Sequence, residues 1–195
     1  MRIFLTVLVL IFGFQSWTKA DDIRDFEIEG ISIGDSLLDH FDKQEIKNNL
    51  QEPYKSKKFI PVEFRYPKFK LKEYESIQTA YKQKDSKYKI YTISGSIFYP
   101  NNIQDCYKKQ KKIFISLKDM FEGQKNIREI PIYESKHSID TSGKSKVSTG
   151  GFLFDSGDSI LVQCMDFSDI IPLDDELVVA IDTKEFADFL NTEAY

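Results

Sequence analysis

Histidine and cysteine are scarce in this chain, and its few glycines form no loop that could hold a phosphate. The 195 residues include two histidines, two cysteines and nine glycines. Because zinc sites draw mainly on histidine and cysteine, most zinc arrangements are excluded. Acidic residues that could gather a calcium ion lack the spacing of an EF-hand loop; they are Asp155, Asp158, Asp174, Asp175 and Glu176. We therefore expect neither a metal nor another cofactor.

Long apolar runs are also lacking, except at the start. Residues 1–20, MRIFLTVLVLIFGFQSWTKA, place Arg2 before an apolar run from Ile3 to Phe14 and end in small residues. This is the layout of a secretory signal peptide, and the run is too short for a permanent membrane helix. We predict cleavage near Ala20, a single domain over 21–195, and a periplasmic or secreted protein with no transmembrane segment after cleavage. An uncleaved anchor is the alternative.

Basic residues are outnumbered, and their distribution is uneven. From residue 21 onward, 25 Lys and Arg stand against 31 Asp and Glu, a net charge of −6. A net acidic exported chain is a poor candidate for binding nucleic acid. Residues 55–89 nevertheless hold eleven bases and four acids, between acidic segments at 21–52 and 166–195. Either this basic middle lies beside the acidic ends in the fold, or it forms a basic face for anionic lipid or polymer.

The two cysteines, Cys106 and Cys164, both follow the predicted leader. An even number of cysteines in an exported chain favours a disulfide, with two buried free thiols as the alternative. Cys106 lies on the apolar stripe of a predicted helix and Cys164 on the apolar face of a predicted strand. Both side chains are therefore expected to point into one core, as a disulfide requires.

The pattern of apolar residues predicts an α+β fold, an antiparallel sheet of about five to seven strands with helices packed on one face. Strands are expected at 59–66, 74–82, 88–100, 127–135 and 177–181, with a hairpin whose tip is 155–158. Helices are expected as a short N-terminal pair, 36–41 and 43–50, and at 102–121. Pro61 should place its strand at a sheet edge, and Gly95 indicates a bulge or a close neighbour. Asp182 with Glu185 resembles the start of a last short helix.

Residues 34–37, Gly34-Asp35-Ser36-Leu37, match the opening motif of the GDSL lipases and esterases, in which the serine is the nucleophile. Such a serine needs a histidine base and an orienting acid. The family's Asp-x-x-His near the C-terminus is absent; the nearest approximation is Glu134-Ser135-Lys136-His137, and the only other histidine is His40. The family's asparagine block is missing too. We therefore expect Asp35 or Ser36 to cap a helix by accepting a backbone amide hydrogen, and we assign no catalytic residue.

Two longer stretches resemble an uncharacterised family of small exported bacterial proteins. They are IEGISIGDSLLDHF, from residue 28, and IDTKEFADFLNTEAY, from residue 181. The resemblance implies an exported, periplasmic setting and carries no known activity. More loosely, a glycine turn, two short helices and an antiparallel sheet resemble outer-membrane assembly lipoproteins and β-lactamase-inhibitor-like domains, which would imply protein binding. The lipid-bearing cysteine of those lipoproteins is absent here.

The sequence thus favours a soluble periplasmic binding or interaction domain without catalysis, whose partner is an unknown envelope protein or ligand. Two alternatives remain. One is a serine esterase that uses Ser36 with His137. The other is an envelope-surface protein that docks through a basic face rich in lysine and tyrosine.

Overall fold

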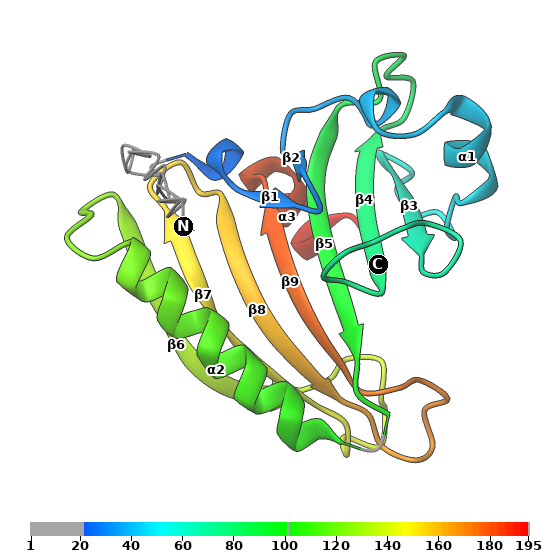
Figure 1. The fold of residues 1–195 in the computed structure, drawn as a ribbon. Helices are drawn as coiled ribbons and strands as arrows, with labels where there is room; N and C mark the ends of the chain where they lie inside the picture. The colour runs from blue at the N-terminus through cyan, green and yellow to red at the C-terminus, as the bar shows by residue number, and fades with distance from the viewer. Residues whose placement is uncertain (1–21, 101, 195) are drawn as a thin grey trace, which may run out of the picture.

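The computed structural model describes residues 22–100 and 102–194, so the predicted leader lies outside the described residues. A large sheet has the strand order β3-β4-β5-β9-β8-β7-β6, with every neighbouring pair antiparallel (Figure 1). Its strands are β3 (Phe59–Arg65), β4 (Ser76–Lys82), β5 (Ile90–Phe98), β6 (Ile127–Lys136), β7 (Lys146–Phe154), β8 (Ser159–Asp166) and β9 (Glu176–Asp182). A small hairpin of β1 (Glu27–Ile28) and β2 (Ile31–Ser32) accompanies it. The α+β class and the antiparallel sheet are confirmed.

The sheet is built from two three-stranded meanders. β3, β4 and β5 form the first, and β6, β7 and β8 form the second; the last strand, β9, lies between β5 and β8 and joins the two halves. Pro61 lies in β3 at one edge, as predicted, because proline cannot donate a hydrogen bond to a further strand. Residues 49–51 cover the outer side of β3, where the Gln51 amide donates to the Pro61 carbonyl at 3.0 Å.

Helix α2 (Ile103–Met120) carries the chain from β5 to β6 and packs on one face of the sheet. Its side chains Cys106, Gln110 and Phe114 are buried. The predicted disulfide is confirmed: Cys106 is bonded to Cys164 of β8, with 6.0 Å between their Cα atoms. This bond fixes the first turn of the helix to the last residues of β8.

Helix α3 (Lys184–Thr192) packs on the opposite face, behind the strands in Figure 1. Phe186 and Phe189 join Phe59 and Ala80 in a second, smaller apolar cluster. The helix is capped by Thr183, whose hydroxyl accepts from the Phe186 amide, so the predicted start at Asp182 is wrong.

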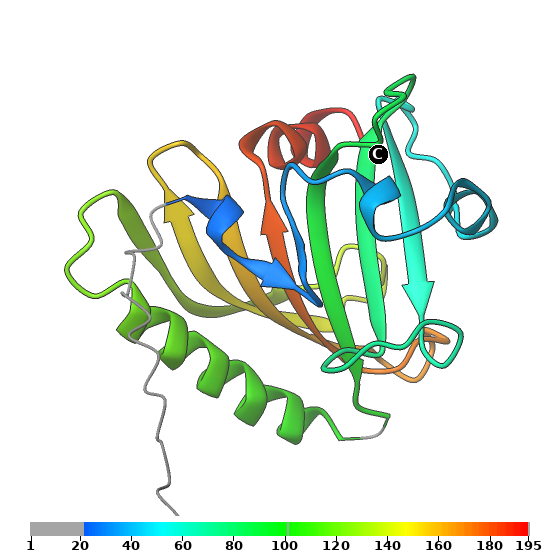
Figure 2. The ribbon, with the colours of Figure 1, turned by 45° about the horizontal axis from the view of Figure 1, so that its top comes forward.

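The N-terminal segment lies on the same face of the sheet as α2 and closes that core (Figure 2). It begins with a 3₁₀ turn, η1 (Ile23–Asp25), and continues after β2 into a second turn, η2 (Leu37–Asp39), and α1 (Lys43–Asn48). These last two elements correspond to the predicted helix pair. Asp42 and Glu45 form a reciprocal capping box at the start of α1. None of the helices in the described residues is long and apolar enough to cross a membrane.

Candidate functional site

The Ser36 hydroxyl already has two partners. It accepts a hydrogen bond from the Leu38 amide at 3.1 Å, which makes Ser36 the N-cap of η2, and it donates to the Lys87 carbonyl at 2.6 Å. Asp35 caps no helix: its carboxylate accepts from the Ser32 amide at 2.9 Å and closes the preceding turn. His40 lies 3.3 Å from that carboxylate, and no hydrogen bond joins His40 to Ser36 in the described chain.

His137 lies far from Ser36. Ser36 is bridged to Lys89, just before β5, whereas His137 follows the last residue of β6. Four strand spacings separate β5 from β6, about 19 Å. The strand registers place the beginning of β6 level with the beginning of β5, so His137 is also displaced by the length of β6, about 30 Å. His137 is therefore too far from Ser36 to act as the base that the serine esterase alternative requires.

His137 instead belongs to a structural loop. Its Nδ1 accepts from the Ile139 amide, and burial lowers its pKa, an effect that the charge of Asp140 only partly offsets. The buried Asp140 carboxylate accepts from Ser145, at both the amide and the hydroxyl, and from the Ser168 hydroxyl. Hydrogen bonds from Ser142 and Ser145 hold the pKa of Asp140 far below its usual value. These groups join the β6–β7 loop to the segment after β8.

The acidic residues considered for calcium do not gather. Asp155 and Asp158 lie at the β7–β8 tip, whereas Asp174 to Glu176 lead into β9 at the other end of the sheet. Asp158 accepts from the Lys184 amide at 2.7 Å, and Asp175 accepts from the Phe167 amide at 2.9 Å. In the parts of the chain that the structure describes, no group of three His, Cys, Asp or Glu side chains could hold a metal ion.

Three carboxylates on the sheet face that carries α3 each meet a hydroxyl of a neighbouring strand. The pairs are Glu63 with Ser76, Glu176 with Ser96, and Asp182 with Thr92. Burial raises the pKa of Glu176 and raises that of Asp182 to about 6. Since each acid has a partner on the next strand, we assign these groups to holding the strands together.

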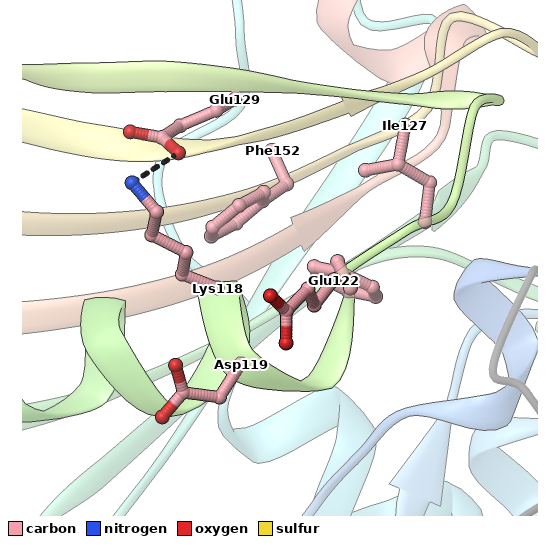
Figure 3. A pocket seen from close by; sticks show the side chains of 7 residues that line it. Lys118, Asp119, Glu122, Ile127, Glu129 and Phe152 are labelled. Carbon is pink, nitrogen blue, oxygen red and sulfur yellow. Dashed lines mark ion pairs between the residues drawn. The ribbon is translucent and has the colours of Figure 1, made fainter.

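A small hollow opens beside the last turn of α2 (Figure 3). Phe121, Ile127 and Phe152 line it, and an ion pair of 2.9 Å between Lys118 of α2 and Glu129 of β6 spans one side. Its volume is about 220 Å³, below the range of roughly 300–1,000 Å³ typical of ligand sites. We therefore do not assign a ligand to it.

The basic segment 55–89 does not form one face, because the β3–β4 hairpin separates it into two halves. Lys68, Lys70 and Lys72 lie in the β3–β4 loop, at one end of the hairpin. The turn before β3 and the β4–β5 turn lie at the other end, where Phe59 pairs with Lys82. The Gln83 amide donates to the Lys58 carbonyl at 2.9 Å, so these two turns are in direct contact.

Four exposed lysines at this second end form no hydrogen bond, ion pair or ring contact through their side chains within the described residues. They are Lys55, Lys57, Lys84 and Lys87, here called the lysine-rich end. Lys58 and Lys82 beside them are paired with Glu185, at 3.8 and 2.8 Å. The β4–β5 turn is the loop at the top of Figure 1, away from α2.

Two of these four lysines have left-handed backbone conformations. The φ angle is 53° at Lys57 and 72° at Lys84. Such angles are uncommon outside glycine and cost an L-residue about 1 kcal/mol or more. Neither side chain is held by a partner in the described structure, so both present their charge to solvent or to another molecule. Tyr88, in the same turn as Lys84, also has a positive φ angle, 52°. This feature could not be predicted from the sequence, because the residue type lysine does not indicate a positive φ angle.

The tyrosines of the same segments turn inward. The Tyr81 and Tyr88 rings lie 4.8 Å apart against the main core, and Tyr54 packs edge-on to Phe189 at 5.1 Å. These rings are only partly exposed, so the expected face of mixed lysine and tyrosine presents mainly lysine.

No family model, no curated protein and no solved structure matches this chain.

Proposed function

We propose that this chain is an exported interaction domain that acts by binding an anionic partner at its lysine-rich end. The leader pattern of residues 1–20 supports export to the periplasm or the medium. The Cys106–Cys164 disulfide supports it too, since such bonds persist in oxidising compartments.

The observation that carries the proposal is the meeting of the two lysine-bearing turns. Seven lysines lie in residues 54–58 and 82–89, and the carboxylates that pair with them or stand in the same turns are those of Asp85, Glu185 and Glu193. Glu185 and Glu193 are already engaged by Lys58 and Lys82. The unpaired cations therefore create a positive potential at one end of an acidic molecule.

The other lysine cluster, on the outward side of α2, is a weaker candidate. Lys108 is paired with Asp105 at 2.7 Å, and Lys118 with Glu129. The beginning of α2 also borders an acidic loop, because Ile103 lines the same hollow as Asp166, Asp169, Asp174 and Asp175. These carboxylates offset the charge of the helix.

Export is tested by expressing the full chain in a bacterium and determining the N-terminus of the periplasmic product. We expect it to begin at or near Asp21, with a gain of two hydrogen masses on reduction. Retention of the whole chain inside the cell would contradict the proposal.

Binding at the lysine-rich end is tested by cation-exchange chromatography at neutral pH. Changing Lys55, Lys57, Lys84 and Lys87 together to Gln should move elution to lower salt. A matched control on α2 changes the same number of exposed lysines to Gln: Lys108, Lys109, Lys111 and Lys112. An equal or larger shift in the control would refute the choice of surface.

A further inference from the structure

We propose that the partner of the lysine-rich end is the surface of an anionic lipid bilayer. This inference rests on the proposed function and names the anionic partner. The cations lie on two adjacent turns at one end of the sheet, so they can approach a flat charged surface together.

The packing of the tyrosines favours a bilayer over single-stranded nucleic acid. Proteins that bind single-stranded nucleic acid combine a basic groove with exposed aromatic rings on which bases stack. At the lysine-rich end the Tyr54, Tyr81, Tyr88 and Tyr91 rings pack against other aromatic rings of the protein. The Tyr91 ring also carries the ammonium groups of Lys82 and Lys89, at 4.5 and 5.6 Å from its centroid. The rings at this end are therefore already engaged within the protein, and the free lysines offer charge to a partner.

The arrangement of charge along the strands would orient the molecule. β9 begins at Glu176 beside the acidic loop 167–175 and ends at Asp182, which pairs with Thr92 near the start of β5. The acidic loop, at the bottom of Figure 1, therefore lies a strand length from the lysine-rich end, about 20 Å. The Debye length is about 8 Å at physiological ionic strength, so repulsion between the acidic loop and the lipid would be largely screened.

The expected affinity is modest and depends on salt. Each lysine close to an anionic surface increases partitioning roughly fivefold, so four would increase it by a few hundredfold. Shortening the Debye length to about 3 Å, with about 1 M salt, should abolish the effect.

The test is co-sedimentation of the purified exported protein with vesicles of phosphatidylcholine and phosphatidylglycerol, and with vesicles of phosphatidylcholine alone. We expect binding to the mixed vesicles only, lost in high salt. The Gln variant of Lys55, Lys57, Lys84 and Lys87 should bind at least tenfold more weakly, while the matched α2 variant keeps most of its affinity. Circular dichroism of both variants checks that they fold alike.

Three outcomes would overturn the inference: no binding to the mixed vesicles at low salt, equal binding to both vesicle types, or equal losses in the two lysine variants. Chromatography on immobilised polyphosphate shows whether a negative result concerns only the bilayer or also the proposed binding of an anionic partner. Retention on polyphosphate that requires the lysine-rich end, without vesicle binding, would leave an interaction domain whose partner is not a bilayer.

Discussion

At the residue scale, the hydroxyl of Ser36 decides between a helix cap and a nucleophile. Ser36→Ala removes the cap of η2 and the link to the Lys87 carbonyl. We expect the free energy of unfolding to fall by about 1 kcal/mol, measured by urea denaturation. A fluorophosphonate probe should label neither protein. Labelling of the parent chain that disappears in the alanine variant would establish a reactive serine.

Glu29 is a second residue whose carboxylate holds the backbone. Burial raises its pKa, but hydrogen bonds from the amides of Glu73, Lys72 and Tyr74 outweigh burial and leave the pKa below its usual value. Glu29→Gln weakens these bonds and should lower the free energy of unfolding by about 1 kcal/mol. Glu27→Gln, the same change at an exposed position two residues earlier, should have little effect. Equal losses in the two variants would contradict this role.

The pKa of Asp182 is shifted in the opposite direction to that of Glu29, and this makes stability depend on pH. Burial raises its pKa to about 6, against the hydrogen bond from Thr92, while the unfolded value is about 3.9. The folded state therefore binds the proton more tightly, and stability falls as pH rises from about 4 to about 6. The ionised group costs the fold up to about 3 kcal/mol at pH 7.

Asp182→Asn removes this titration. The variant should be more stable than the parent at pH 7, and its advantage should shrink as pH falls through 6 towards 4. Urea denaturation of both proteins across this range measures the difference, in which the titration of Glu176 cancels. An advantage that does not vary with pH would show that Asp182 is not the titrating group.

At the scale of elements, the disulfide is the one covalent link between α2 and the sheet. Replacing Cys106 and Cys164 together by Ala should lower the free energy of unfolding by about 2–4 kcal/mol. Urea denaturation measures the loss, and the reduced parent protein should show a similar one. If reduction leaves the parent's stability unchanged, the link does not contribute as expected.

Most elements could be predicted from the sequence because their apolar periods are strong. The helix predicted at 102–121 is α2, and Gly95 does have a close neighbour, since a Cβ atom there would lie 2.5 Å from the Tyr74 ring. The start of α3 was mistaken because Asp182 resembles a cap. Its carboxylate instead accepts a hydrogen bond from the Thr92 hydroxyl on the neighbouring strand β5. Thr92 is 90 positions away, so a local sequence pattern does not indicate this pairing.

At the scale of the whole molecule, the candidate site could be predicted only in part. The excess of lysine in residues 55–89 is plain in the sequence, but which lysines meet depends on the β3–β4 register. That register brings the ends of the segment together and sends Lys68, Lys70 and Lys72 to the opposite end. The inward turn of the tyrosines depends equally on tertiary packing, because Tyr54 reaches residues of α3 more than 130 positions later.

The positive φ angles of Lys57 and Lys84 cost stability, whereas the charges of these two side chains serve the proposed binding. Replacing Lys57 and Lys84 by Gly removes a backbone cost of about 1 kcal/mol at each site, while the added freedom of glycine in the unfolded chain offsets about 0.5–1 kcal/mol. The free energy of unfolding should therefore stay level or rise by up to about 1 kcal/mol, although binding at the lysine-rich end weakens. Lys55→Gly with Lys87→Gly is the matched control, because neither residue has a positive φ and glycine there should only destabilise. Urea denaturation compares the two pairs. Equal losses of stability in the two pairs would show that the backbone at Lys57 and Lys84 is not strained.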